Sequence, residues 1–194
     1  MKAVLIAIHP RWCELIASGK KTIEVRKTKP KLDVPFKCYI YCTMPKNKHD
    51  NLVLTPFGYD VGSEAAYCNY TGNSNGKVIG EFVCDDIDTV HIFNERLYCV
   101  KNSQANKLGQ MCLSIEEVKA YLGDKNGYNW HISDLIVYDE PRELSEFYVW
   151  KKCNSCRDTG YESTACCYDE DCRVPAVITR PPQSWMFIES EDTE

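Results

Sequence analysis

The pattern of apolar and polar positions predicts short strands separated by two helices. Residues 2–8, KAVLIAI, form a continuous apolar run of the kind found in a buried strand. Directly after this run, Trp12, Leu15 and Ile16 are spaced at i, i+3 and i+4, which places them on one face of a helix. Gly19 suits the end of that helix because glycine tolerates the left-handed backbone common there. The chain therefore opens with a buried strand and an amphipathic helix.

The next segment, residues 19–27 with the sequence GKKTIEVRK, combines β-branched and charged residues. Ile23 and Val25 alternate with Glu24 and Arg26, and side chains at period two point to opposite faces of a strand. We expect the aliphatic pair to pack in the core. The acid and the guanidinium are then expected to open onto a shared, positively charged hollow, with a solvated outer face as the simpler alternative.

The remaining pattern predicts a second helix and several more strands. The helix is expected over residues 113–123, because Ser114 and Glu117 have capping-box spacing and Gly123 suits its end. Gly80 marks a bulge or a close backbone approach. Two helices and five or six strands that do not alternate regularly predict an α+β fold, a small mixed β-barrel with two or more flanking helices. Further strands are expected at 36–43, at 77–93, within 128–147 and at the end of 180–189.

The length of 194 residues fits a single domain with two insertions. Residues 44–76 are rich in turn-forming residues, and residues 151–178 are rich in cysteine. No apolar run approaches the roughly 20 residues that a membrane helix needs. Arg11 and Glu14 interrupt the first apolar run early, so we expect no targeting signal, no membrane contact and a cytoplasmic protein.

The net charge of −5 conceals an uneven distribution along the chain. Residues 1–48 carry eleven Lys or Arg and three Asp or Glu, a balance of +8, and the remainder carries twelve against twenty-five, a balance of −13. Such asymmetry is typical of a protein with one face that meets an anion, unless the charges cancel in three dimensions. Four lysines extend the positive stretch and are candidate contacts for a nucleic-acid backbone: Lys20, Lys27, Lys29 and Lys31.

The order of these elements and one short motif resemble the ASCH domain of the PUA-like superfamily. KAVLIAIHP, SGKKTIEVRK, CYIYCT, GKVIGEF and RPPQSW follow one another in the family's order. The resemblance covers most of the chain outside residues 44–76 and 151–178. It implies a small β-barrel with a cleft lined by the family signature. That signature, G-x-K-x-x-E-x-R, falls on Gly19, Lys21, Glu24 and Arg26.

The resemblance also implies binding of RNA or of a nucleotide or nucleoside ligand, with Lys21, Glu24 and Arg26 as contacts. One branch of the family is an amidohydrolase that acts on N(4)-acetylcytidine through a lysine, a threonine two positions before the motif arginine and a separate glutamate. Here Lys21 matches the lysine, Glu24 stands at the threonine position, and KLGQM at residues 107–111 offers no third glutamate. A small amidohydrolase is therefore the alternative function. Its catalytic set is Lys21 as base, Thr22 or a water as nucleophile, and Glu24.

The chemistry of the motif residues suits a charged ligand. Because a guanidinium holds phosphate through paired hydrogen bonds, Arg26 and Lys21 are expected to meet phosphate while Glu24 accepts from base or sugar donors. A Glu24–Arg26 pair that only neutralises itself is the competing interpretation. A histidine beside the first helix and two tryptophans that can stack an unpaired base complete the candidates. A core position is the competing interpretation for both tryptophans, and Trp130 is the one expected to face the cleft, because it precedes a strand. The predicted ligand contacts are Lys20, Lys21, Glu24, Arg26, His9, Trp130 and Trp185.

Twelve cysteines are many for a chain of this kind. Seven lie singly and are expected to be small core residues in a reducing cytosol: Cys13, Cys38, Cys42, Cys68, Cys84, Cys99 and Cys112. The other five crowd into residues 153–172, a polar segment that cannot build its own core. Four thiolates there would form a closed, structural zinc site, with disulfides or free thiols as the competing interpretations. The predicted zinc ligands are Cys153, Cys156, Cys167 and Cys172, with Cys166 as a substitute for Cys167.

The function predicted from the sequence is thus a cytoplasmic RNA- or nucleotide-binding module. A third interpretation, besides the amidohydrolase, is a protein-interaction module that uses the two insertions to hold a protein partner. Salt-dependent RNA binding that is lost in Arg26→Ala favours the first function. Acetate release that is lost in Lys21→Ala favours the second, and no effect of either substitution favours the third.

Overall fold

Strands dominate the described part of the chain, and the helices found there are few and short. The computed structural model describes residues 2–45, 52–55, 58–61, 74–100, 107–153 and 172–189, with side chains in all of these ranges except 52–55 and 58–61. The helices are α1 (Pro10–Ala17), α3 (Lys107–Met111) and α4 (Ile115–Leu122), with one 3-10 turn, η2 (Leu144–Glu146). The strands are β1 (Lys2–Ile8), β2 (Ile23–Arg26), β3 (Phe36–Cys42), β4 (Leu52–Thr55), β5 (Gly58–Val61), β6 (Lys77–Cys84), β7 (Ile87–Phe93), β8 (Arg96–Cys99), β9 (Gly127–His131), β10 (Ser133–Glu143), β11 (Tyr148–Lys152), β12 (Arg173–Val177) and β13 (Trp185–Glu189). None of the helices in these ranges is long and apolar enough to cross a bilayer.

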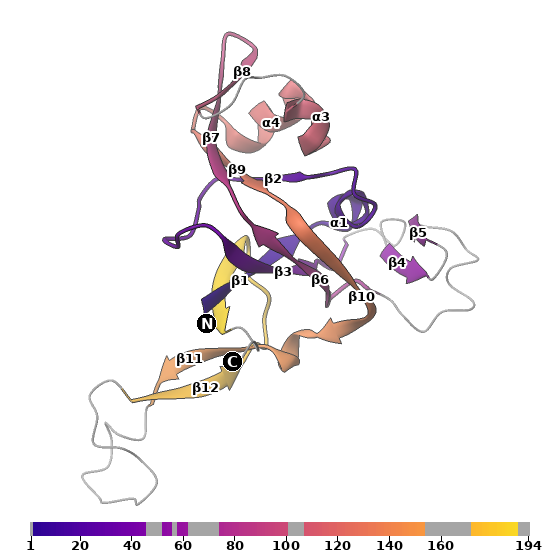
Figure 1. Cartoon of the computed structure of the whole chain (residues 1–194), viewed down its shortest axis with the longest axis vertical. Helices are drawn as coiled ribbons and strands as arrows, with labels where there is room; N and C mark the ends of the chain where they lie inside the picture. Colours follow the sequence, from indigo (N-terminus) through magenta and orange to yellow (C-terminus); the bar gives the residue numbers. More distant parts are fainter. Residues whose placement is uncertain are drawn as a thin grey trace, which may run out of the picture.

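Two sheets form the body of the molecule (Figure 1). The five-stranded sheet has the order β10-β6-β3-β1-β13, in which β1 and β3 are parallel and the other neighbours are antiparallel. The four-stranded sheet has the order β2-β9-β7-β8 and is antiparallel throughout. Two separate hairpins, β4–β5 and β11–β12, fall in or beside the predicted insertions, most of which lie outside the described residues. The predicted α+β class is confirmed, but the described strands show no closed barrel, so barrel closure stays unconfirmed.

Two long strand segments each pass from one sheet to the other. β6 belongs to the five-stranded sheet and β7 to the four-stranded sheet, with only Asp85 and Asp86 between them. β9 and β10 change sheet in the same way just after His131. The His131 N–H donates to the Asp86 carbonyl at 2.9 Å, and His131 Nδ1 lies 2.6 Å from Asp85 Oδ1, so the two crossings lie side by side. The single strands predicted at 77–93 and within 128–147 are therefore wrong, because each segment forms two strands.

Gly80 allows β6 to lie tightly against β10. A Cβ atom at this position would be 2.3 Å from the carbonyl oxygen of Ile136, so any side chain would displace the backbone. The register between β3 and β6 also shifts between Ile40 and Tyr41, next to the residue that pairs with Gly80. The predicted close backbone approach at Gly80 is confirmed.

The four-stranded sheet is covered on both faces, which explains why all four residues of β2 are buried. On one face, Glu24 is the direct cross-strand partner of Trp130, which is fully buried in the core of the five-stranded sheet. On the other face, Ile23 and Val25 pack against α3 and α4. Their partners there include Met111, Val118 and Leu122. The predicted alternation of faces along β2 is confirmed, and the charged face is buried between elements instead of lying in solvent.

Helices α3 and α4 differ in how clearly the sequence predicts them. α4 begins at the predicted capping box, where Ser114 Oγ accepts from the Glu117 N–H at 3.2 Å and Glu117 Oε2 accepts from the Ser114 N–H at 2.8 Å. α3 has five residues with Gly109 in the middle, so it is too short to show a helical period. It forms because Met111 packs into the core formed with β2 and α4.

Most single cysteines of the described chain lie in the core. Burial raises the pKa values of the Cys13 and Cys38 thiols well above the ordinary value, and burial raises the pKa of Cys84 to about 12. These thiols therefore stay protonated near neutral pH and act as small apolar side chains. Cys13, Cys38, Cys42 and Cys84 are buried, Cys99 and Cys112 are partly buried, and Cys68 lies outside the described residues.

Candidate functional site

Three charged side chains of the motif form one buried cluster. Glu24 lies between two cations, with its Oε2 3.3 Å from Lys21 Nζ and its Oε1 3.0 Å from Arg26 Nη2. Only 2% of Lys21, 6% of Glu24 and 6% of Arg26 is exposed. One carboxylate with two cations leaves a net positive charge in a surrounding of low dielectric constant, where electrostatic interactions are strong.

Backbone carbonyls and one hydroxyl hold the two cations in place. Lys21 Nζ donates to the Met111 carbonyl at 2.6 Å, at the end of α3. Arg26 Nη2 donates to the Ala7 carbonyl of β1 at 2.7 Å, and Nη1 lies 3.4 Å from both the carbonyl oxygen and Oγ of Ser184, just before β13. The cluster therefore ties together both sheets and α3, and its geometry is set by segments far apart in the sequence.

A cavity of about 590 Å³ opens beside this cluster. Lys21, Glu24 and Arg26 lie in its wall. α1 contributes Trp12 and α4 contributes Tyr121, so aromatic side chains from two helices line it as well. Its volume falls within the roughly 300–1,000 Å³ typical of small-molecule sites. The apolar part of the lining is completed by Ala7, Val25, Leu113 and Ala120.

The charged wall keeps hydrogen-bonding capacity for a ligand. Arg26 Nε is buried and has no hydrogen-bond partner among the described residues. An unpaired buried donor costs about 1–3 kcal/mol, so an acceptor that reached this atom would be stabilised, but a ligand in the cavity meets it only after the side chain shifts. Glu24 carries acceptor lone pairs beside it. The wall thus offers an acceptor directly and a donor after this shift.

Cations also lie over both aromatic residues of the cavity. The Arg11 guanidinium carbon is 4.5 Å from the centroid of Trp12, and Lys27 Nζ is 5.1 Å from the centroid of Tyr121. Both cations are exposed, and Arg11 Nη1 lies 3.6 Å from Oε1 of Glu117, an acidic residue of the cavity lining. Burial raises the pKa of the Tyr121 hydroxyl, so this ring stays neutral near neutral pH.

The structure brings only part of the predicted ligand set to this cavity. His9 lies in the wall with the three motif residues and makes no side-chain cap to α1. Trp130 is 0% exposed and packs edge-on against Phe36 at 5.8 Å between ring centroids, so it is a core residue that cannot stack on a ligand. Trp185 lies beside it, outside the cavity lining, and donates from Nε1 to Thr28 Oγ1 at 3.0 Å.

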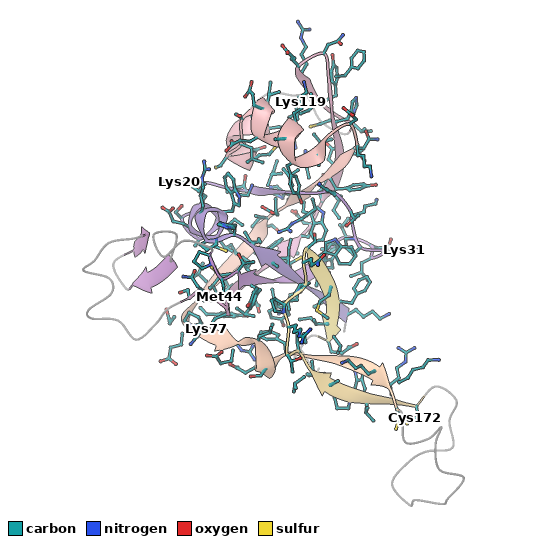
Figure 2. All side chains as sticks on the ribbon, turned by 180° about the vertical axis from the view of Figure 1, so that it is seen from behind. Lys20, Lys31, Met44, Lys77, Lys119 and Cys172 are labelled. Carbon is teal, nitrogen blue, oxygen red and sulfur yellow. The ribbon has the colours of Figure 1, made fainter. Side chains whose placement is uncertain are left out.

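Lys20 and Thr22 flank the motif lysine, but neither belongs to the lining. The Thr22 N–H donates to the Gln110 carbonyl at 3.0 Å, and its own carbonyl accepts from Ile132, so this residue serves as a backbone bridge. Thr22, one of the two nucleophiles considered for the amidohydrolase alternative, is therefore not part of the cavity wall, and the other, a water, stays a prediction. Figure 2 shows Lys20 and Lys31 at opposite edges of the molecule, so these two lysines of the basic stretch lie far apart.

Sequence reasoning missed the aromatic walls and the carbonyl partners of the cations. The helical periodicity assigns Trp12 and Tyr121 to apolar stripes, yet both line the cavity. A tyrosine at the edge of such a stripe is the one available signal, because its polar tip favours partial exposure. Met111 and Ala7 act through backbone carbonyls, and residue identity carries no trace of that role.

The cysteine-rich segment falls only partly within the described residues. Cys153 and Cys172 meet at the end of the β11–β12 hairpin, where the Cys153 N–H donates to the Cys172 carbonyl at 3.0 Å. Cys156 and Cys167 lie outside the described ranges. Where side chains are described, no group of three or more metal-ligating residues is found, so the zinc site stays a prediction.

Comparison with known proteins identifies the fold. The structure is similar to the crystal structure of ASCH from Zymomonas mobilis, with a TM-score of 0.53 and 18% identity, over 97% of this chain and 89% of that one. A tyrosine-to-phenylalanine variant of the Z. mobilis protein gives a TM-score of 0.51 at 18% identity, over 98% of this chain and 93% of that one. A serine-to-alanine variant gives 0.51 at 17% identity, over 97% and 89%. None of the curated proteins compared with the chain matches it.

The sequence itself identifies the family. The profile of the ASCH domain matches residues 6–142, which is more than half of the chain and runs from within β1 to within β10. The matched span contains the buried cluster of Lys21, Glu24 and Arg26 and both aromatic residues of the cavity wall. The hairpin β11–β12 and the cysteine-rich segment lie beyond it. The chain belongs to the ASCH domain family, which has the PUA-like fold.

Proposed function

We propose that the cavity binds the base of a nucleotide, either free or as an unpaired residue of RNA. The observation that carries this proposal is the buried Lys21–Glu24–Arg26 cluster, set in the wall of a cavity that two aromatic side chains also line. A nucleobase is a flat ring whose edge carries hydrogen-bond donors and acceptors close together. The aromatic side chains of the cavity can stack on the flat ring, and the charged cluster can form hydrogen bonds with its edge.

The edge of the base would meet Glu24 and Arg26. The Glu24 carboxylate accepts from an exocyclic amino group or a ring N–H, and the unpaired Arg26 Nε, once its side chain shifts, donates to a neighbouring ring nitrogen or carbonyl. Lys21 holds Glu24 in place from the other side. Because Lys21 and Arg26 are buried and engaged internally, we assign the phosphate to the exposed cations Arg11 and Lys27 at the cavity edge.

Replacing Tyr121 with alanine is expected to weaken nucleotide binding about 5- to 150-fold, because one stacking partner of the base is removed. Tyr121 is 39% exposed on α4, so the substitution leaves the core intact. The measurement is isothermal titration calorimetry with the four ribonucleoside 5′-monophosphates and with a five-nucleotide RNA.

Two variants and one ligand control this experiment. Tyr121→Phe keeps the ring and is expected to bind as the unchanged protein does. Lys119→Ala removes an exposed residue from the same helix and outside the lining, with the same expectation. Ribose 5-phosphate, which lacks the base, is expected to bind far more weakly. Equal binding by Tyr121→Ala, or equal affinity for ribose 5-phosphate, contradicts the proposal.

We also propose a structural zinc ion in the cysteine-rich segment. The hairpin brings the backbones of Cys153 and Cys172 within hydrogen-bonding distance, although 18 residues separate them in the sequence. This pairing supports a four-thiolate site to which Cys153 and Cys172 would contribute two ligands and Cys156 and Cys167 the other two. A closed site of this type contributes folding energy to a segment without a core.

Elemental analysis of the full chain, prepared without added zinc, is expected to give about one zinc ion per molecule, as a closed four-thiolate site requires. The double variant Cys153→Ser/Cys172→Ser is expected to lose it. Cys112→Ser, a partly buried cysteine outside the segment, serves as the control and should retain the metal. Less than half an equivalent of zinc in the unchanged protein contradicts the site.

A further inference from the structure

The β11–β12 hairpin projects from the body of the molecule as an arm (Figures 1 and 2). Its base is anchored by Phe147 and Ile178, which are buried in one core cluster and joined by a hydrogen bond of 2.9 Å from the Ile178 N–H to the Phe147 carbonyl. The arm follows the span that matches the ASCH domain, which ends within β10. A two-stranded hairpin is marginally stable alone, which raises the question of what its free surface contacts.

The register of the hairpin places aromatic and charged residues on one surface. Residues directly opposite each other in antiparallel strands point to the same face, and the face then alternates along the strand. Trp150 is 46% exposed and Val177 is 57% exposed on this surface, and Val174 is 40% exposed on the opposite face. We call it the arm face, and it consists of Tyr148, Trp150, Lys152, Arg173, Pro175 and Val177.

The outer end of the arm face concentrates positive charge. Lys152, the last residue of β11, lies directly opposite Arg173, and the preceding residue, Lys151, points to the other face of the hairpin. All three are exposed, and no ion pair joins any of them to a residue of the described chain. Like charges directly opposite each other destabilise a hairpin. In a chain with a net charge of −5, such a pair is best explained by an anion that binds between the two side chains.

We infer that the arm face binds a single strand of nucleic acid. A base stacks on Trp150, and the neighbouring phosphate lies between Lys152 and Arg173. Alternate residues of a strand are about 7 Å apart, so one face presents the ring and the charges to adjacent parts of the same ligand. This interaction goes beyond the proposed function, because it uses residues and a surface separate from the cavity.

Two other sources of negative charge are competitors for this surface. One is an acidic peptide, which would pair with the cations without needing the tryptophan. The other is the chain itself, since residues 154–171 contain five acidic residues and one arginine. The aromatic ring favours nucleic acid over both, because base stacking on an exposed tryptophan is a recurrent mode of single-strand binding.

The test is fluorescence anisotropy of a labelled twelve-nucleotide single-stranded RNA with the full chain, titrated at several salt concentrations. In Lys152→Gln/Arg173→Gln, we expect at least about fivefold weaker binding at low salt. We also expect the slope of log affinity against log salt to be shallower by about 0.7 for each phosphate that the variant no longer neutralises. In Trp150→Leu, which keeps an apolar side chain, we expect at least about fivefold weaker binding with the salt dependence unchanged.

Lys119→Gln/Lys125→Gln is the matched control, because it removes two exposed cations from in and beside α4. Figure 2 shows Lys119 and Cys172 at opposite ends of the molecule, so this control leaves the arm untouched. Its RNA affinity and salt dependence should exceed those of the arm double variant. RNA binding by the arm variants equal to that of the control overturns the inference. So does displacement of the RNA by a polyglutamate peptide at equal charge concentration.

The two proposals fail separately. Loss of mononucleotide binding in Tyr121→Ala together with unchanged RNA binding in the arm variants overturns the arm and leaves the cavity proposal standing. Weakened RNA binding in the arm variants of a chain that binds no mononucleotide supports the arm and overturns the cavity proposal. Circular dichroism of each variant shows that the comparison is made between folded chains.

Discussion

Replacing Glu24 with glutamine is expected to lower the free energy of unfolding by about 3–5 kcal/mol. The substitution keeps the size of the side chain and removes the charge that lies between Lys21 and Arg26. Both cations then remain buried without a counter-charge, and desolvated charges of like sign repel each other strongly. Urea denaturation followed by tryptophan fluorescence measures the change.

A double-mutant cycle separates this electrostatic effect from a packing defect. Lys21→Met removes one of the stranded cations, so Lys21→Met/Glu24→Gln should lose less stability than the sum of the single changes. Lys77→Gln breaks a more exposed pair with Glu143 and should cost no more than about 1 kcal/mol. A loss below about 1 kcal/mol in Glu24→Gln would mean that water or another group already solvates the cluster, contrary to its burial.

Replacing Trp130 with alanine is expected to cost about 3–5 kcal/mol, because it leaves a cavity at the junction of the two sheets. The ring is fully buried and packs between Phe36 and Trp185, at 5.8 and 6.1 Å between centroids. Trp130 lies next to the strand crossing at Asp85 and Asp86, so its removal affects both sheets. Thermal and urea unfolding both measure the change in stability.

The matched control for this substitution is another tryptophan. Trp150→Ala removes a ring that is 46% exposed on the arm and is expected to change stability by no more than about 0.5 kcal/mol. RNA binding should show the reverse order: Trp150→Ala is expected to weaken it, and Trp130→Ala is not, because Trp150 contributes to RNA binding and Trp130 does not. Equal stability of the two variants would contradict the assignment of Trp130 to the core.

The sequence correctly predicts the elements whose structure is determined by residues within one short segment. The apolar run of β1, the stripe and C-terminal glycine of α1 and the capping box of α4 all depend on residues within one element, and each forms where expected. The alternation along β2 also follows from local geometry. It correctly places Ile23 and Val25 in the core against α3 and α4, although Val25 also reaches the lining of the cavity beside Glu24 and Arg26.

The features that were missed depend on which elements pair. A strand that changes sheet at Asp85 and Asp86 looks like one continuous strand in sequence, because both halves keep a period of two. Trp130 was predicted to face the cleft because it precedes a strand, whereas its pairing with Glu24 across β2 and β9 places it in the core. Local patterns carry no information about such partners.

In the candidate site too, the residues within one short motif could be predicted, and those brought in by packing could not. Lys21, Glu24 and Arg26 could be predicted because a motif of eight residues contains them all. Tyr121 could not, since its neighbours in the cavity lie about a hundred residues earlier in the chain and only the packing of α4 against β2 brings them together.

The central claim is that the buried cluster and the aromatic walls hold a nucleobase. A crystal structure of the full chain soaked with a nucleoside 5′-monophosphate tests it most directly. We predict the base in the cavity between Trp12 and Tyr121, with its edge within hydrogen-bonding distance of Glu24. An empty cavity at saturating nucleotide, or a base bound elsewhere with only phosphate near Arg26, would contradict this account.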